Sequence, residues 1–200
     1  MKIAVVGLQG AVSEHIEATK KAMENLGIEG TVIWARTSEE LKDADGIILP
    51  GGESTTIGKL ALEKGLRSEI IKLAKKGMPV LGTCAGLVLM AKALKNDKGN
   101  SSKRLLGLLG IMVNRNAFGT QVDSFEEEVE VKGIGRVNGI FIRAPVIEKV
   151  NDPKIKVIAK LGGRIVGVEK GNLIALSFHP ELTEDTSVHE YFLGMCKAKA

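Results

Sequence analysis

Short apolar runs alternate with amphipathic segments over the first half of the chain. Four of these runs have the length and composition of buried parallel strands, at 3–6, 31–34, 46–49 and 79–82. The segments between them carry apolar residues at helical spacing and predict helices over 13–26, from residue 38, over 56–76 and over 87–94. Ser13 is predicted to cap the first helix and Gly27 to end it. The alternation predicts a parallel sheet wrapped by right-handed crossovers, with ligands bound at the carboxyl ends of its strands.

From about residue 105 onward, short strand patterns follow one another, with turn residues between them. The predicted strands are 111–113, 126–131, 139–142, 156–161, 164–168 and 173–177, and a helix over 185–197 follows them. This succession predicts a mixed or antiparallel extension of the same sheet in the C-terminal half. The polar stretch 95–103 is predicted to be a surface loop. No composition shift marks a boundary, so we expect residues 1–200 to form a single α/β domain.

Composition narrows the functional classes. Hydrophobic residues make up 44% of the 200 residues and charged residues 26%, which is typical of a globular protein and not of a disordered chain. The formal net charge of +4 is spread over 28 basic and 24 acidic residues, without a dense Lys/Arg run and with few aromatic residues. We therefore expect no nucleic-acid binding, and interpret the slight basic excess as a solvated surface.

The sequence carries no evident targeting or metal-binding signal. The apolar run at 3–6 is too short for a signal peptide, and no apolar stretch approaches membrane-spanning length. The two cysteines, Cys84 and Cys196, form neither a disulfide framework nor a Cys-x-x-Cys metal pair. We therefore expect free thiols in a reducing cytoplasm, no metal site and no membrane contact.

Cys84 lies at the centre of the pattern glycine, any residue, nucleophile, any residue, glycine, between a predicted strand and a predicted helix. Such a turn is sharp, holds the nucleophile in a strained backbone conformation and needs small residues on either side, here Gly82 and Gly86. The N-terminus of the following helix favours a thiolate, and the N–H of Ala85 is free to face an oxyanion. The alternative is that Cys84 is a small buried hydrophobic residue, which is the role we assign to Cys196.

His179 and Glu181 follow the last predicted strand, with a proline between them. A nucleophilic thiol needs a base, because a free thiol is only a few per cent ionised at neutral pH. The proline favours an extended His179, so that side chains two residues apart point the same way and Glu181 can orient the imidazole. With Cys84 they predict a triad, whereas alone they would indicate a turn after a strand. His15 and His189, among polar neighbours on predicted helices, are interpreted as surface residues.

Gly51 and Gly52 follow the third predicted strand. A glycine-rich loop at a strand end can cradle a phosphate, but the Walker spacing and its lysine are missing, as is Gly-x-Gly-x-x-Gly. The interpretation that we favour is a second oxyanion N–H from Gly52, with a tight turn as the alternative. One such donor typically contributes about 3 kcal/mol of transition-state stabilisation.

Together these features resemble a class I, triad-type glutamine amidotransferase domain. Nearly the whole chain is similar to the family of glutaminase subunits of pyridoxal 5′-phosphate synthase. Three segments specific to that family are Gly51-Gly52-Glu53-Ser54-Thr55, Arg115-Asn116-Ala117-Phe118-Gly119 and Ile142-Arg143-Ala144-Pro145. The cysteine turn and the His-Pro-Glu run are shared with the wider class. The family usually has arginine where this chain has Thr120, so the resemblance does not extend to a salt bridge or partner contact at that position.

The resemblance implies a three-layer, flavodoxin-like α/β fold with a central, mostly parallel sheet. It implies Cys84 as nucleophile, His179 as base and Glu181 as the residue that orients the base. It also implies glutamine contacts from Gly52, Glu53, Ser54, Arg115, Ile142 and Arg143. These residues suit a glutamine zwitterion, which needs a cation or N–H groups for its carboxylate and an acceptor for its ammonium. No metal or organic cofactor is required.

The reaction expected from the resemblance releases ammonia from L-glutamine through a glutamyl thioester on Cys84. The chain is too short to hold a second domain that would use the ammonia, so we expect a separate acceptor enzyme to dock over the site. The resemblance makes this acceptor the synthase subunit that builds pyridoxal 5′-phosphate, in a hetero-oligomer. Gln9 lies in the loop after the first strand, where docking could be sensed. We expect weak activity until the synthase orders the oxyanion loop.

Two alternatives remain at this point. One is a different enzyme on the same fold, either a cysteine peptidase or a glutaminase that supplies another pathway. The other is a binding module without catalytic activity that keeps the fold.

Overall fold

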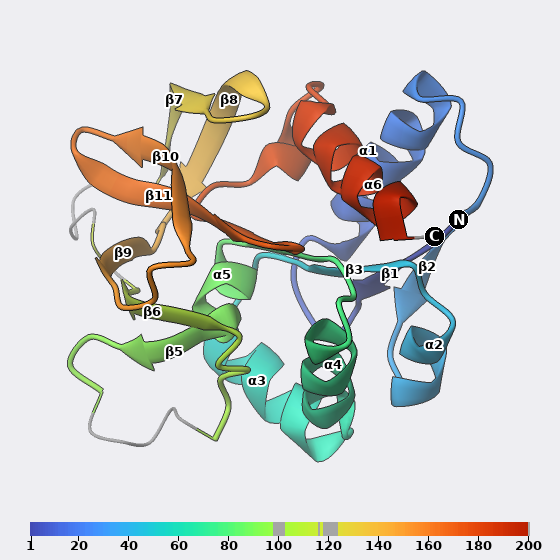
Figure 1. The fold of residues 1–200 in the computed structure, drawn as a ribbon. Helices are drawn as coiled ribbons and strands as arrows, with labels where there is room; N and C mark the ends of the chain where they lie inside the picture. Colours follow the sequence, from blue (N-terminus) through green and yellow to red (C-terminus); the bar gives the residue numbers. More distant parts are fainter. Residues whose placement is uncertain (98–102, 116, 118–123, 200) are drawn as a thin grey trace.

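The computed structural model describes residues 1–97, 103–115, 117 and 124–199. These residues form a sheet of twelve strands with helices on both faces, in three layers. Helices α1 (Val12–Asn25) and α6 (Ser187–Lys199) lie side by side on one face (Figure 1). The other face carries α2 (Ser38–Lys42), α3 (Ser54–Glu63), α4 (Leu66–Lys75) and α5 (Ala85–Met90). No helix in the described part of the chain is long and apolar enough to cross a membrane.

One half of the sheet is parallel. Its strands pair in the order β2 (Thr31–Ala35), β1 (Lys2–Val6), β3 (Gly46–Leu49), β4 (Val80–Thr83) and β12 (Leu173–Leu176). The four strands predicted in the first half of the chain are all present, and β12 joins them from near the C-terminus. Because β12 pairs in parallel with β4, the segment after β12, which holds His179, lies beside the turn after β4, which holds Cys84.

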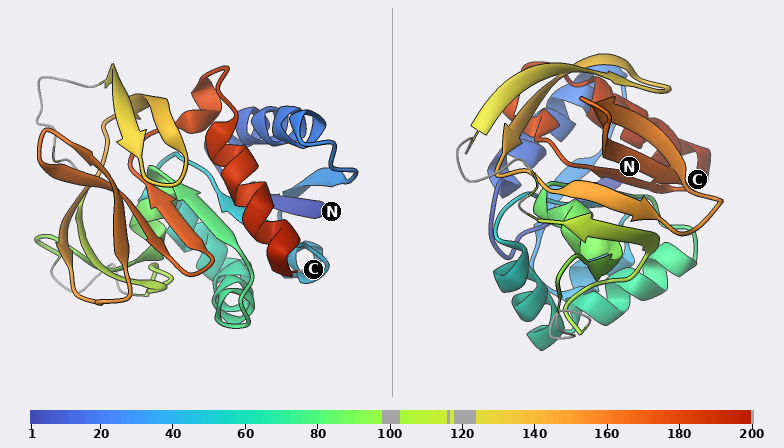
Figure 2. Two further views of the ribbon diagram at one scale, coloured as in Figure 1. Left: turned by 45° about the horizontal axis from the view of Figure 1, so that its top comes forward. Right: turned by 90° about the vertical axis from the view of Figure 1, so that its left-hand side faces the viewer.

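The other half of the sheet is largely antiparallel and confirms the predicted extension. It continues from β12 through β11 (Arg164–Lys170), β10 (Lys156–Leu161), β7 (Ser124–Val131) and β8 (Gly135–Ile142). A branch from β11 runs through β9 (Val146–Val150), β6 (Leu109–Asn114) and β5 (Ala91–Leu94). Figure 2 shows that these strands gather on the side of the molecule away from the two chain ends. The sequence pattern did not predict β9.

The helix predicted over 87–94 is only partly correct. Helix α5 ends at Met90, and the next four residues form β5. The Ala/Leu-rich sequence favours a helix, but pairing of β5 with β6 outweighs that intrinsic preference. The predicted loop at 95–103 lies partly outside the described residues.

Two other helix boundaries also differ from the predictions. The helix predicted over 56–76 is divided at Gly65, whose φ of 70° belongs to the left-handed region. Helix α1 begins at Val12, so Ser13 lies inside the helix, where its hydroxyl bonds to Glu14 and caps nothing. Gly27, with a φ of 60°, follows the end of α1 as predicted.

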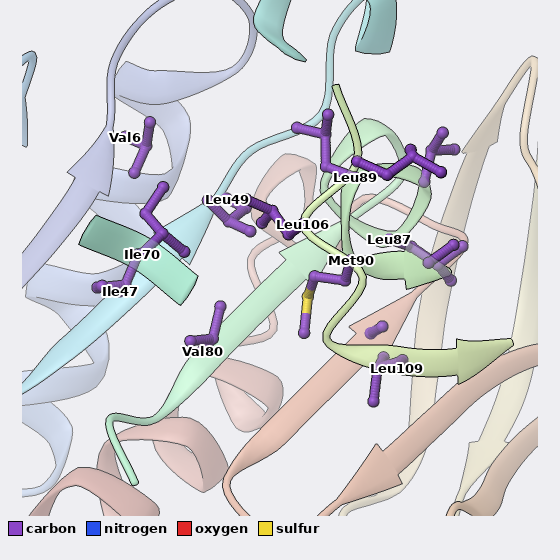
Figure 3. Packing of buried hydrophobic residues seen from close by; sticks show 14 of the residues in the cluster. Val6, Ile47, Leu49, Ile70, Val80, Leu87, Leu89, Met90, Leu106 and Leu109 are labelled. Carbon is purple, nitrogen blue, oxygen red and sulfur yellow. The ribbon is translucent and has the colours of Figure 1, made fainter. Parts of the chain in front are cut away.

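Apolar side chains pack against both faces of the sheet. Alternate residues of β1 point opposite ways, so Ile3 and Val5 pack toward α1 and α6, whereas Val6 belongs to the cluster beneath the other helices. Figure 3 shows this second cluster, with Val6, Ile47, Leu49, Ile70, Val80, Leu87, Leu89, Met90, Leu106 and Leu109 converging between the sheet and α4 and α5. Close packing on both faces holds the carboxyl ends of the central strands in place, and the candidate site is built on these ends.

Candidate active site

The turn between β4 and α5 holds Cys84 in a strained conformation. Its φ of 47° and ψ of −99° are unusual for a residue with a side chain. A Cβ on Gly86 would lie 2.1 Å from the carbonyl oxygen of Leu49, and one on Gly82 would lie 2.8 Å from the backbone of Gly86. The glycines are therefore required for close approach of strand and helix, as predicted. The N–H of Cys84 donates to the carbonyl of Leu176 at 2.8 Å, which ties the turn to β12.

His179 lies directly across from this turn. Its backbone N–H donates to the carbonyl of Ile140 at 2.8 Å, and its imidazole and the Cys84 thiol line the same cavity, close enough for Cys84 to raise the pKa of His179. The Nδ1–H of the imidazole donates to Oε1 of Glu181 at 2.7 Å. The structure thus brings together the three residues predicted to form a triad, from segments far apart in the sequence.

The local backbone of the His-Pro-Glu run differs from the prediction. Residues Pro180–Leu182 form a 3-10 turn, with His179 as its N-cap, and not an extended segment. Glu181 therefore reaches the imidazole by the curl of the turn, and not by the alternation of an extended chain. The predicted contact is present, but the reason given for it was wrong.

The charged forms of His179 and Glu181 stabilise one another. Burial favours a neutral His179, but its interactions with Cys84 and Glu181 outweigh this effect and raise the pKa of His179 to about 10. Burial also disfavours ionised Glu181, yet interactions with His15 and His179 lower its pKa below the usual 4.5. The structure therefore favours an imidazolium held between a carboxylate and the sulfur at neutral pH, which is the state that activates a thiol nucleophile.

Gly51 makes room for the imidazole. A Cβ on Gly51 would lie 2.2 Å from Cε1 of His179. The sequence pattern placed Gly51 in an oxyanion loop or tight turn and did not predict this contact. The glycine loop therefore has a second role, which is to leave space for the base.

The glycine loop is also fastened to the loop after β1. The backbone N–H of Glu53 donates to the side-chain oxygen of Gln9 at 2.8 Å, and the N–H of Ala11 donates to the carbonyl of Gly51 at 3.2 Å. Gly52 has a φ of 149°, and a Cβ on Gly10 would lie 1.7 Å from the carbonyl oxygen of Gly51. The two loops are therefore in close contact, so displacement of either one would disturb the other.

The side chain of Glu53 caps helix α3. Its carboxylate accepts hydrogen bonds from the N–H of Thr55 at 2.9 Å and from the N–H and hydroxyl of Thr56, both at 2.7 Å. Partial burial opposes ionisation, but these bonds outweigh it and lower the pKa of Glu53 to about 2. Arg115 donates to the hydroxyl of Thr55 at 3.1 Å, so this cation also lies beside the capped helix end.

A cavity of about 490 Å³ opens over the thiol and the imidazole. It is lined by Gln9, Gly52, Glu53, Ser54, Cys84, Ala85, Val88, Arg115, Ile142, Arg143, Pro145 and His179. Every residue predicted to contact glutamine is among them, and Glu181 is buried behind His179. Two guanidinium groups beside a nucleophile suit a small ligand that carries a carboxylate. Asn116, Phe118, Gly119 and Thr120 lie outside the described residues.

The predicted surface positions of His15 and His189 were wrong. Both were interpreted as surface residues, but both are completely buried between α1, α6 and the triad. A signal for burial was present, since His15 follows Val12 by three residues and His189 precedes Phe192 by three, each on the apolar side of its helix. Cys196 is buried on α6 as a packing residue, as predicted.

No group of three or more His, Cys, Asp or Glu side chains in the described ranges is arranged to hold a metal ion. The site instead offers a thiol, an imidazole and a carboxylate in contact, below a cavity with two cations. This arrangement on an α/β sheet is the one that cysteine-dependent acyl-transfer enzymes use.

Comparison with known proteins identifies the family. The model of the SNO glutamine amidotransferase family matches residues 5–198, and the chain belongs to this family. The pyridoxal 5′-phosphate synthase subunit PdxT of Thermococcus gammatolerans is 53% identical over 194 residues, which are 96% of this chain and 98% of that protein. The PdxT subunit of Archaeoglobus fulgidus is 48% identical over 195 residues, 98% of each chain.

Solved structures agree with this assignment. A crystal structure of a glutamine amidotransferase has a TM-score of 0.85 and 45% identity, and the match covers 98% of each chain. PurLQS from Thermotoga maritima, with a TM-score of 0.71 and 18% identity over 100% of this chain and 98% of its own, shares the fold. The predicted fold class and the resemblance to glutamine amidotransferases are therefore confirmed.

Proposed function

We propose that this chain is the glutaminase subunit of a pyridoxal 5′-phosphate synthase, and that Cys84, His179 and Glu181 carry out the hydrolysis of L-glutamine. The relatives named as PdxT, about half identical over nearly the full length, support the pathway. The observation that carries the residue assignment is the imidazole of His179 facing the same cavity as the Cys84 thiol while its Nδ1 lies 2.7 Å from Oε1 of Glu181. Residues 1–200 act as a single glutaminase domain.

The reaction proceeds in two halves. The Cys84 thiolate attacks the side-chain amide carbon of glutamine, and the N–H groups of Gly52 and Ala85 hold the oxyanion. His179 gives a proton to the nitrogen as the carbon–nitrogen bond breaks, so ammonia leaves and a glutamyl thioester remains. His179 then takes a proton from water, the hydroxide attacks the thioester, and glutamate is released with the thiolate restored. The net reaction consumes one water for each ammonia.

Glutamine is held by the cavity walls. Arg115 and Arg143 suit its carboxylate, and the carbonyl of Ile142, 3.9 Å from the Cys84 sulfur, is an acceptor near the reacting centre. Glu53 and the backbone of Gly52 and Ser54 complete the proposed contacts. Because the Glu53 carboxylate already accepts three hydrogen bonds from the start of α3, its contribution to an ammonium is the negative charge near the helix end.

The ammonia passes to a separate synthase subunit. Free ammonia is protonated in water, so transfer requires the acceptor to cover the cavity. Gln9 lies where this contact can be sensed, because its side chain holds the backbone of Glu53 in the glycine loop. The lone subunit is therefore weakly active as a glutaminase, and docking of the synthase subunit stimulates it. The two free thiols suit the reducing cytoplasm.

The decisive experiment replaces the nucleophile within the complete complex. Cys84→Ala should abolish pyridoxal 5′-phosphate synthesis from glutamine and spare synthesis from added ammonium. A glutamine-like electrophile should modify Cys84 and leave Cys196 unmodified. Loss of synthesis from both nitrogen sources would indicate a structural role for Cys84. Cleavage of peptides, or ammonia delivery to a different synthase, would favour one of the other enzymes considered above.

A further inference from the structure

Two buried imidazoles lie in series behind the proposed triad. Nε2 of His15 lies 3.2 Å from Oε2 of Glu181, the carboxylate oxygen that does not bond to His179. Nδ1 of His15 lies 3.0 Å from Nε2 of His189. His15 comes from α1, His189 from α6 and Glu181 from the turn after β12, so the series joins three elements. Both histidines have no accessible surface.

The His15 ring also contacts the residue before the nucleophile. Its Nε2 lies 2.9 Å from the hydroxyl of Thr83, which is fully buried. One nitrogen of His15 therefore contacts both the Glu181 carboxylate and the turn that holds Cys84. These two contacts decide whether that nitrogen carries a hydrogen.

The contacts select the tautomer of His15. A bare nitrogen lone pair facing a carboxylate oxygen at 3.2 Å would be repulsive, whereas an N–H there is attractive. Nε2 of His15 therefore carries the hydrogen and donates it to the Thr83 hydroxyl, and this N–H dipole lies beside Oε2 of Glu181, which accepts no hydrogen bond among the described residues. Nδ1 of His15 accepts from the Nε2–H of His189. Nδ1 of His189 is then an unprotonated nitrogen, which fits its having no hydrogen-bond partner among the described residues.

Both rings are neutral at neutral pH. Burial lowers the pKa of His15, with Glu181 and Glu14 opposing the change and His179 adding to it. Burial and the neighbouring His15 lower the pKa of His189 to about 3, against the pull of Glu181. The pair therefore acts on Glu181 through a fixed N–H dipole and not through a formal charge.

We propose that His15, with its tautomer set by His189, is a positioning residue that holds the Glu181 carboxylate against His179. With Oε2 fixed by His15, Oε1 stays on Nδ1 of His179, and the opposite ring nitrogen stays directed at the thiol. Without His15, Oε2 loses the N–H dipole that lies 3.2 Å from it, and because Oε2 accepts no hydrogen bond among the described residues, the carboxylate is freer to rotate away from the base. This inference rests on the proposed triad.

The test uses the complete complex and four variants: His15→Leu, His15→Gln, Glu181→Gln and the His15→Leu/Glu181→Gln double variant. His15→Leu should lower kcat for glutamine hydrolysis about 10- to 100-fold with little change in KM, as expected on losing an N–H dipole beside a buried charged group that orients the base. His15→Gln, whose amide N–H can replace Nε2–H, should restore much of this loss. The double variant should be no slower than Glu181→Gln, because His15 acts through that carboxylate.

Several outcomes would overturn the inference. Additive losses in the double variant would mean that His15 acts independently of Glu181, and a rise in KM with unchanged kcat would place it in substrate binding. Cys84→Ser is measured in parallel: if that variant still hydrolyses glutamine, the triad itself is wrong, whereas a loss there with normal His15→Leu activity rejects only the role of His15.

Control measurements test whether each variant still folds. Ammonium-dependent synthesis and the thermal midpoint are measured for each variant, and Cys196→Ala on α6 provides a buried substitution remote from Glu181. If His15→Leu fails to fold, His189→Gln tests the same series from its far end. It should lower kcat below that of the wild type and shift the pH profile of kcat/KM, and an unchanged profile and kcat would refute the role assigned to the pair.

Discussion

The backbone of Glu53 donates its N–H to the side chain of Gln9 across 2.8 Å, so the glycine loop and the loop after β1 are directly bonded. This bond connects a residue at the cavity rim to the backbone proposed to hold the oxyanion. A change at the outer surface of the first loop can therefore reach the reacting centre without passing through the core.

Replacing Gln9 should weaken the coupling between the loop after β1 and the glycine loop. Gln9→Ala removes the acceptor for the Glu53 N–H, and loss of one hydrogen bond of about 1 kcal/mol corresponds to roughly a fivefold effect. We expect glutamate release in the presence of synthase to fall by about that factor. The measurement compares glutamate release with and without synthase for the variant and the wild type. Equal turnover by the wild type in both conditions would contradict the sensing role of this loop.

Replacing Gly51 should impair the base. In Gly51→Ala the new methyl would lie 2.2 Å from Cε1 of His179, so the ring must move away from the thiol or from Glu181. We expect kcat to fall at least about tenfold, since small misplacements of catalytic groups have large effects. Steady-state kinetics measure the change, and Gly194→Ala, where no atom lies within 4 Å of the new Cβ, is the matched control. Full activity of Gly51→Ala would show that the imidazole position is not restrictive.

His189 should make the fold sensitive to acid. An unfolded histidine binds its proton near pH 6.5, whereas His189 in the folded protein does so only near pH 3. Between these values the unfolded state binds more protons, so the free energy of unfolding falls as the pH falls, by up to about 1.4 kcal/mol per pH unit. Urea denaturation from pH 7 to pH 4 should give a shallower decline for His189→Gln than for the wild type. Cys196→Ala should keep the wild-type slope, and identical slopes for all three proteins would reject the prediction.

His179 should contribute the opposite dependence at alkaline pH. Its folded-state pKa of about 10 lies above the ordinary 6.5, so the stability that it contributes is fully present below pH 6.5 and lost as the pH rises through 10. We expect the difference in unfolding free energy between wild type and His179→Gln to shrink over this window. Parallel denaturation series at pH 6, 8 and 10 measure it, and a constant difference would count against the charged pair.

Removing the Glu53 side chain should affect both stability and substrate binding. Glu53→Ala deletes the cap of α3 and should cost about 1 kcal/mol of stability. It should also raise KM for glutamine, because the helix end and Arg115 line the cavity. Thr37→Ala removes the cap of α2, away from the cavity, and serves as the control for a cap loss without a change in KM. Denaturation and kinetics on both variants separate the two effects.

The features that could be predicted from sequence are those with a local pattern. The parallel strands follow from short apolar runs, and Cys84 is recognisable from the glycines on either side of it. The His-Pro-Glu run gave the right pair of residues, although the 3-10 turn that joins them differs from the extended chain expected.

What escaped prediction depends on contacts between segments distant in the sequence. Strand β5 exists because β6 pairs with it, which overrides a helical local sequence. The need for Gly51 to leave room for His179 arises only after β3 and β12 are placed on either side of β4. His15 and His189 have polar neighbours in sequence, which outweighed the apolar residues three positions away in the prediction, and their burial is completed by the packing of α1 on α6.

The parallel pairing of β12 with β4 has a consequence for biosynthesis. The thiol is made long before the imidazole, and the two meet only when a strand from near the end of the chain inserts beside one from its middle. A chain still emerging from the ribosome, or one cut short before His179, would therefore hold a cysteine without its base. If the proposed triad carries the reaction, only molecules in which β12 has inserted beside β4 release ammonia.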